Sequence, residues 1–230
     1  MRILNNQEKK RSKNSEWIVK NFPKDYLYLD YLEPYGGVSV LLKKDPSNFE
    51  AINIDDETWT AIFRALRDEP KLLLGKIKRL KFSEKTFEAY RNKQKSDDYI
   101  KNAVRELVLY KMSIGGKRKK FGGAGSTWEH MIKSLYVIAD RIKFVHIFDH
   151  DVISIIKAFN QPESLLFIEP PHFDDTQEVA TLHLSLADIL NQVYSKVVVY
   201  YPICTFYNNH YSAWRCVKKA NSKEALWLNY

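Results

Sequence analysis

The stretch YLYLDYLEPYGGVSVLLKK, residues 26–44, predicts how the fold of this chain begins. It starts as an aromatic, strand-like run, passes through Glu33 and Pro34 to the pair Gly36 and Gly37, and continues into an apolar run that ends in two lysines. Two glycines directly after a strand are typical of a tight turn, because glycine alone adopts left-handed backbone angles freely. We therefore expect a strand, a glycine turn and a helix, in that order.

The next segments repeat this alternation. FEAINID, residues 49–55, is typical of a second strand, and DDETWTAIFRALRD, residues 55–68, is typical of a second helix. The helix is expected because acidic residues occupy its first turn and Arg64 and Arg67 lie near its end, where they suit the helix dipole. The first 68 residues therefore indicate a βαβα arrangement.

From residue 69 to residue 130 the character of the chain changes. Charge density rises and strand signals disappear, while helical periodicity appears in residues 71–80 and 97–112. The segment ends in IGGKRKKFGGAGSTW, residues 114–128, which holds five of the eight glycines of the chain and four consecutive cations. We expect a basic helical insertion at 69–130 that ends in a flexible, positively charged loop.

Alternation returns after the insertion. Strands are predicted at FVHIF, SLLFIEPP and KVVVYYP, helices are predicted between them, and residues 215–230 are typical of a terminal pair of strands. The predicted fold class is α/β, Rossmann-like, with a mostly parallel central sheet covered on both faces. Residues 1–68 and 131–230 form its core, interrupted by the helical insertion.

The composition favours a globular protein with an anionic partner. Lys and Arg number 36 against 28 Asp and Glu, which gives a net charge of +8 and favours nucleic acid as a partner. We expect a cytoplasmic protein, because no secretory signal or membrane-length apolar run is found and two cysteines cannot build a disulfide framework. Cys204 and Cys216 are expected to be buried small hydrophobic residues.

Several motifs, in a fixed order, resemble one enzyme family. They are the turn Glu33, Pro34, Tyr35, Gly36 and Gly37; the segment INIDDETWTAIFRALRD; the helical insertion; the segment LLFIEPPH that ends in Glu169, Pro170, Pro171 and His172; and the ending KEALWLNY. In that order they are similar to the Dam-like class of DNA adenine-N6 methyltransferases, which use S-adenosylmethionine. Each motif alone is weak, and the joint order carries the resemblance.

The resemblance implies a Rossmann-like methyltransferase core and a role for each motif. The glycine turn, Glu33 to Gly37, would hold S-adenosylmethionine, and Asp55 or Asp56 would contact its ribose. In the family, the Asp of a DPPY motif and a proline carbonyl accept hydrogen bonds from the adenine amino group, and the Tyr stacks on the flipped base. Here the corresponding catalytic residues would be Glu169, Pro170, Pro171 and His172. The insertion would be the target-recognition lobe.

The chain departs from the family pattern at positions that chemistry needs. The proline-glycine-glycine-lysine loop that opens the family has no counterpart, since no glycine precedes Gly36, although Lys13 stands near the place of the family lysine. The glycine turn is one residue short, and Ile54 occupies the usual first acidic position. EPPH replaces DPPY, as EPP replaces DPP in the non-catalytic partner of the eukaryotic RNA adenine-methylating heterodimer. A misplacement of about 1 Å can cost roughly a hundredfold in rate.

Three functions stay open at this point. The first is a degenerate, non-catalytic DNA-binding subunit that supports an active sister subunit of a restriction-modification type methyltransferase, with weak or lost S-adenosylmethionine binding. The second is an active, divergent DNA adenine-N6 methyltransferase. The third is an unrelated basic nucleic-acid binder whose motifs coincide by chance. The first is preferred because the departures fall on chemical positions while scaffold features are kept.

Other patterns have plainer interpretations beside functional ones. Lys117, Arg118, Lys119 and Lys120 are expected to contact DNA phosphates, with Phe121 and Trp128 beside a groove, although such charge runs are usually solvated. His146, Asp149 and His150 invite a metal site, but no cysteine or third histidine lies nearby, so none is expected. Most aromatic residues of YYPICTFYNNHYSAW are expected to pack the core.

Overall fold

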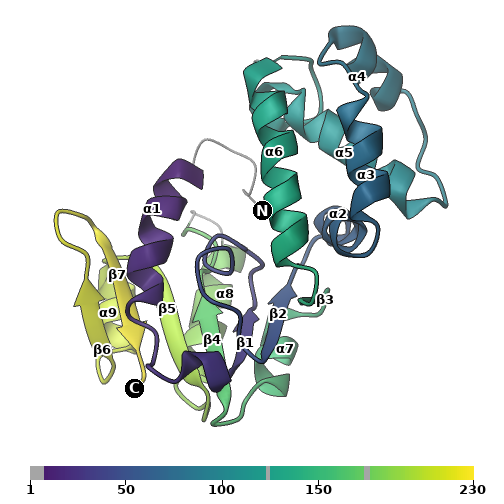
Figure 1. Cartoon of the computed structure of the whole chain (residues 1–230). Helices are drawn as coiled ribbons and strands as arrows, with labels where there is room; N and C mark the ends of the chain where they lie inside the picture. The colour runs from purple at the N-terminus through teal and green to yellow at the C-terminus, as the bar shows by residue number, and fades with distance from the viewer. Residues whose placement is uncertain (1–7, 123–124, 174–176) are drawn as a thin grey trace. The chain divides into compact units, whose positions relative to one another are not determined.

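The chain forms two compact units in the computed structural model, which describes residues 8–122, 125–173 and 177–230 (Figure 1). The sheet unit consists of the residues up to Asp55 together with Phe148–Tyr230. The helical unit is Asp56–Ile147, so it starts earlier and ends later than the insertion predicted at 69–130. Each unit is described by itself below.

The described residues form a seven-stranded sheet that is mostly parallel, which confirms the α/β class. The strand order is β3-β2-β1-β4-β5-β7-β6. Strand β1 pairs in parallel with β2 and β4, and β4 pairs in parallel with β5, whereas β7 is antiparallel to both β5 and β6. The strands are β1 Asp30–Glu33, β2 Phe49–Asn53, β3 His146–Phe148, β4 Ser164–Ile168, β5 Lys196–Pro202, β6 Arg215–Lys218 and β7 Glu224–Leu228.

Helices cover both faces of this sheet. One face, which includes Leu32, Leu166 and Val197, packs against α7 Val152–Ala158, α8 Gln177–Leu190 and α9 Thr205–His210 in one apolar cluster. The opposite face lies under α1 Glu8–Val19 and the segment that follows it, where Phe22 contacts the rings of Tyr31 and Phe167. The single turn η1, Tyr26–Tyr28, leads from there into β1.

The helical unit has its own core. Its elements are α2 Glu57–Asp68, α3 Pro70–Lys78, α4 Glu84–Arg91, α5 Tyr99–Lys111, the turn η2 Ile114–Gly116 and α6 Gly125–Arg141. The apolar face of α2 contributes Trp59, whose ring meets that of Tyr110 on α5 at 5.0 Å, edge to face. Because α2 packs against α5 and α6, it belongs to the helical unit and not to the predicted 1–68 core.

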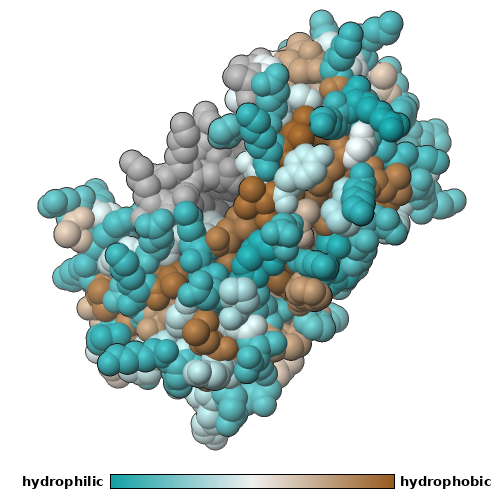
Figure 2. Space-filling view, in the orientation of Figure 1, coloured by the Kyte–Doolittle hydropathy of each residue, from teal (hydrophilic) through white to brown (hydrophobic). Residues whose placement is uncertain are grey.

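The surface in view is largely hydrophilic, with apolar side chains between the charged ones (Figure 2). The apolar side chains of the core strands are buried, including every residue of β4. Among the described residues, no helix combines the length and the apolar character needed to cross a membrane.

The helix predicted after the glycine turn is absent, and that prediction is wrong. Residues 38–44 form successive turns instead, in which the amide of Leu42 donates to the carbonyl of Val38 at 2.8 Å. Val38 has φ 40°, a left-handed angle that is strained for a β-branched residue. The Leu41 amide donates to the Glu33 side chain at 2.8 Å, so a carboxylate replaces the backbone partner that a helix would supply.

Gly36 lets β1 and β2 come together after their ends. Its φ is 49°, and a Cβ atom there would lie 2.7 Å from the carbonyl oxygen of Asn53 and 2.8 Å from the Ile54 side chain. Any larger residue would therefore meet both steric overlap and backbone strain. The neighbouring Gly37 has ordinary contacts, since its added Cβ would lie no closer than 3.6 Å to another atom.

Both predictions for the cysteines are wrong. Cys204 is half-buried immediately before α9, and Cys216 is exposed on β6, at the edge of the sheet. An edge strand has one neighbour only, and most of β6 faces solvent, so Cys216 is not covered.

We expect Gly36→Ala to lower the free energy of unfolding by about 2 kcal/mol or more, because overlap with Asn53 adds to the cost of a left-handed alanine. Urea unfolding followed by circular dichroism measures the change.

Gly37→Ala is the matched control in the same turn and should change stability by less than about 0.5 kcal/mol. Equal losses in the two variants would show that the approach of Gly36 to β2 does not constrain the turn.

Candidate functional site

The candidate site lies at the carboxyl ends of β1 and β4. Strand β1 lies between β2 and β4: β2, which follows it in the chain, pairs along one edge of β1, and β4 pairs along the other edge. In open α/β sheets such a reversal of strand order forms a crevice where ligands bind. The two predicted motifs, Glu33–Gly37 and Glu169–His172, follow these two strands, so the structure brings them together.

Glu33 is the last residue of β1, and its carboxyl group is buried, with 2% of the residue exposed. Oε1 accepts hydrogen bonds from the Tyr31 hydroxyl and from the Leu41 amide, both at 2.8 Å, while the buried Oε2 has no hydrogen-bond partner among the described residues. Burial is the largest cause that raises the pKa of Glu33 from 4.5 to about 7, and the nearby Glu169 raises it further. The two hydrogen bonds oppose this shift without cancelling it.

Gly37 lies between two carboxyl groups. A Cβ atom at Gly37 would be 3.6 Å from Oε2 of Glu169 and 3.7 Å from Oε2 of Glu33. Both acids therefore face the same bare segment of backbone, one from the end of β1 and one from the residue after β4. Two like charges this close cannot both ionise without cost, which agrees with the raised pKa of Glu33.

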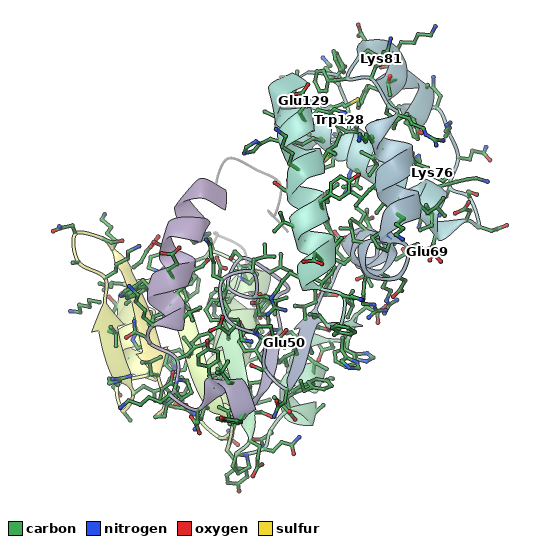
Figure 3. The ribbon with its side chains drawn as sticks, viewed as in Figure 1. Glu50, Glu69, Lys76, Lys81, Trp128 and Glu129 are labelled. Atoms are coloured by element: carbon green, nitrogen blue, oxygen red, sulfur yellow. The ribbon has the colours of Figure 1, made fainter. Side chains whose placement is uncertain are left out.

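A series of contacts between buried polar groups holds the Glu33 side chain in position. Glu50 on β2 forms a buried ion pair with Lys44, whose ammonium group also donates to the Ser47 hydroxyl at 2.9 Å (Figure 3 labels Glu50). The same ammonium lies 4.5 Å from the centre of the Tyr31 ring, and the Tyr31 hydroxyl donates to Glu33. These contacts fix the Tyr31 ring and, through it, the orientation of the Glu33 carboxyl group.

Asn53 is a positioning residue that the sequence analysis missed. This fully buried side chain at the end of β2 donates to the carbonyls of Pro34 at 3.1 Å and His150 at 3.0 Å, and its Oδ1 accepts from the His150 amide at 2.9 Å. It therefore joins the ends of β1 and β2 to the segment after β3. An amide that ends an apolar strand is the signal that would have identified it.

The predicted ribose contacts are divided between the two units. Ile54 is buried, with its amide bonded to the Phe148 carbonyl at 2.9 Å, so no carboxylate stands at that position. Asp55 follows it and is exposed. Asp56 begins the helical unit and accepts a hydrogen bond from the Trp59 amide, so it acts as the N-cap of α2.

Tyr35 contributes a second polar atom without a partner. Its hydroxyl is buried and has no hydrogen-bond partner in the part of the chain that the structure describes. Burial raises the pKa of Tyr35, with the charges of Asp151 and Asp55 as further causes. The Tyr35 ring packs against the apolar cluster between the sheet and helices α7, α8 and α9, and the neighbouring Pro34 is also buried. The aromatic residue of the turn therefore serves the core as well as the site.

The segment after β4 is held by a histidine that the sequence analysis also missed. Glu169 is half-buried, Pro170 is buried, and Pro171 and His172 are exposed. The Pro171 carbonyl lies 2.9 Å from Nε2 of His183. Since a carbonyl only accepts, Nε2 carries the proton, and Nδ1 accepts from the Tyr207 hydroxyl at 2.8 Å.

Aromatic rings surround this histidine. Phe173 stacks on His183 at 3.9 Å between ring centres, and its amide donates to the Tyr201 hydroxyl at 2.5 Å. Burial lowers the pKa of His183, which keeps the imidazole neutral. The ring of His172 is tilted at 5.6 Å from that of Tyr201. Most aromatic residues of the segment at 200–214 pack in or against the core, as predicted.

The predicted DNA-binding loop belongs to the helical unit. Lys117, Lys119 and Lys120 are exposed, whereas Arg118 is half-buried and lies 3.3 Å from Oε2 of Glu106 without hydrogen-bond geometry. Gly115, Gly116 and Arg118 have positive φ angles, and a bridge between Ser113 and Phe121 closes the loop. Three of the four cations are therefore turned to solvent.

The aromatic residues beside this loop pack within the helical unit. Phe121 packs against the rings of Phe82 and Phe87, and Trp128 is buried on α6 (Figure 3). Trp128 is therefore a core residue of the helical unit, and Phe121 is half-buried, as is usual for such large rings. His146, Asp149 and His150 belong to no group of three metal-ligating side chains within the part of the chain that the structure describes.

No model of a known protein family matches this chain, and no curated protein matches it either. Its function is therefore argued from the geometry above.

We expect Glu33→Gln to change how stability depends on pH. The folded chain raises the pKa of Glu33 from 4.5 to about 7, so the stability that this group contributes is complete below about pH 4.5 and is lost as the pH rises through 7. Glutamine stays neutral, so the variant should gain on the order of 3 kcal/mol relative to the parent between pH 4.5 and 8. Urea unfolding across this range tests it.

Glu163→Gln, at an exposed position, is the control and should follow the parent at every pH. Parallel profiles for Glu33→Gln and the parent would contradict the buried, proton-holding state of Glu33.

Proposed function

We propose that this chain is a degenerate member of the Dam-like class of DNA adenine-N6 methyltransferases, which binds DNA and supports an active sister subunit without efficient catalysis of its own. The observation that carries the proposal is the meeting of the two motifs: Gly37 of the glycine turn lies between the carboxyl groups of Glu33 and Glu169. The family pattern requires a cofactor turn and a DPPY segment at adjacent strand ends, and here the glycine turn and EPPH occupy these two places.

The sheet supports this proposal at the level of fold. A reversed last strand inserted between the fifth and sixth strands is typical of Rossmann-like methyltransferases, and β7 has this position and direction. This support is an analogy between folds, and one fold can carry many functions. The residues of the site carry the rest.

The residues fit S-adenosylmethionine only in part. Bare backbone at Gly37 and two carboxyl groups suit the cationic part of such a ligand. The end with a carboxylate needs donors, but residues 8–17 of the segment that replaces the family's glycine-lysine loop lie in helix α1, where the backbone amides beyond the first turn bond internally. Residues 5–7 and the side chain of Lys13 lie outside the described part. Weak cofactor binding follows.

The groups that would hold adenine are also altered. Glu169 is longer than the family Asp, and the Pro171 carbonyl already accepts from His183. His172 is exposed and presents an imidazole where the family has a phenol. Both contacts to a flipped base are therefore changed, which supports a role in binding over a role in transfer.

DNA binding is assigned to the exposed lysines of the loop. Replacing Lys117, Lys119 and Lys120 together with Ala should weaken binding to duplex DNA and reduce the slope of log K against log salt by about 2 to 3. Binding releases about one counterion for each phosphate that a cation contacts, so fewer contacts release fewer counterions. Fluorescence anisotropy with a labelled duplex at several salt concentrations measures this.

The control replaces three other exposed lysines of the helical unit, Lys71, Lys85 and Lys133, with Ala. If both triple variants reduce the slope equally, the loop has no special role and binding follows net charge.

The chain alone should bind S-adenosylmethionine weakly and transfer methyl groups to duplex DNA at least about a hundredfold more slowly than a family member with intact motifs. Calorimetry with the cofactor and a labelled-methyl assay test this, with and without an active sister subunit. Glu169→Asp combined with His172→Tyr restores the family motif and should not restore brisk transfer, because the cofactor contacts stay altered.

Brisk turnover by the parent chain alone would instead establish the alternative, an active and divergent DNA adenine-N6 methyltransferase. Activity that appears only with the partner, together with DNA contacts from this chain, supports the subunit role.

A further inference from the structure

A basic pocket lies in the helical unit. It measures about 510 Å³ and is formed by the ends of α3 and α4, the connection after α4, and α5. None of the residues that line it is acidic. Its cations are Lys76, Arg79, Lys93, Lys101 and Arg105.

Two of these cations have no acidic partner among the described residues. Lys76, which Figure 3 labels on α3, is half-buried, and Arg79 follows the end of the same helix; neither takes part in an ion pair in the described part of the chain. Lys101 has only a long contact of 3.6 Å with exposed Asp98. Like charges gathered in one pocket repel each other, and a bound anion removes that cost.

The walls of the pocket are fixed before any ligand binds. Asn102 holds the connection after α4 through the backbone of Ser96, accepting from its amide at 2.9 Å and donating to its carbonyl at 2.5 Å. The Arg105 guanidinium donates to the Lys93 carbonyl at 2.9 Å and also forms an ion pair with Glu106, so its charge is already partly compensated. These bonds hold α5 against the connection, so the cations are presented on a defined surface.

The remaining wall is apolar and aromatic. Leu80, Tyr90 and Val104 line the pocket, and the Lys93 ammonium lies 4.0 Å from the centre of the Tyr90 ring. Apolar and aromatic side chains beside several cations suit a ligand that carries both an aromatic base and phosphates. The volume falls within the range of about 300 to 1,000 Å³ that is usual for small-molecule sites.

We propose that this pocket binds a nucleoside di- or triphosphate, with the phosphates against the cations and the base against the wall of Leu80, Tyr90 and Val104. A polyphosphate concentrates its negative charges on the oxygens of adjacent phosphate groups, as the pocket concentrates its cations. A DNA strand instead distributes one charge about every 3.4 Å along an extended track. The proposal concerns the helical unit alone and does not depend on the methyltransferase assignment.

The test measures binding of the full chain to a nucleoside triphosphate, the matching monophosphate, and inorganic tripolyphosphate by calorimetry. Affinity should rise from the monophosphate to the triphosphate, and tripolyphosphate should bind more weakly than the nucleoside triphosphate because it lacks a base. Lys76→Ala combined with Arg79→Ala should reduce triphosphate affinity at least about tenfold, since two charge-assisted contacts are lost.

The matched control is Lys71→Ala with Lys81→Ala, which removes the same charge from exposed positions at either end of α3 without touching the pocket (Figure 3 labels Lys81). It should leave affinity within about twofold, and circular dichroism should show both double variants folded. Equal losses in both variants would overturn the proposal, as would tripolyphosphate binding as tightly as the nucleotide. Duplex DNA that binds through Lys76 and Arg79 and is not displaced by the triphosphate would overturn it as well.

Discussion

The carboxyl group of Glu33 is almost completely removed from water, and the arrangement around the ends of β1 and β4 depends on how the chain accommodates it. An isolated buried carboxylate would be prohibitively costly, so such a group is either paired, hydrogen-bonded or neutral. Here Tyr31 and the Leu41 amide satisfy one oxygen, and protonation neutralises the group near pH 7. The Leu41 bond also sets the path of residues 38–44, because it takes an amide that a helix would need.

The same buried network explains why the site is defined without a ligand. Lys44 and Glu50 neutralise each other within the core and hold the Tyr31 ring, while Asn53 fixes the ends of the neighbouring strands. A buried ion pair of this kind gives little net stability, since desolvation offsets attraction, but losing one partner leaves a charge in the core. The ion pair instead serves to fix the orientation of the Tyr31 ring. The conformation of the glycine turn is therefore set by residues that are not themselves predicted to bind a ligand or to act in catalysis.

The sequence predicted the elements whose signals are local. Alternating apolar segments identified β1, β2, β4 and β5, and the change in charge density identified the helical region, because these patterns reflect burial directly. It did not predict the turns at 38–44, since the Leu41 amide bonds to a side chain eight residues earlier. Asn53 and His183 were missed for the same reason: their partners lie 97 and 24 residues away. The boundary at Asp56 depends on the packing of α2 against α5, which no local pattern records.

Gly36 and Asn53 are two positions at which the structure leaves little room for substitution. Neither needs a cofactor or a substrate to be indispensable, since one admits no side chain and the other bonds to two backbone segments. Glu169 and His172, by contrast, lie at a half-buried and an exposed position where many residues fit. The path of the backbone at this edge of the sheet therefore constrains Gly36 and Asn53 more tightly than it constrains the residues after β4.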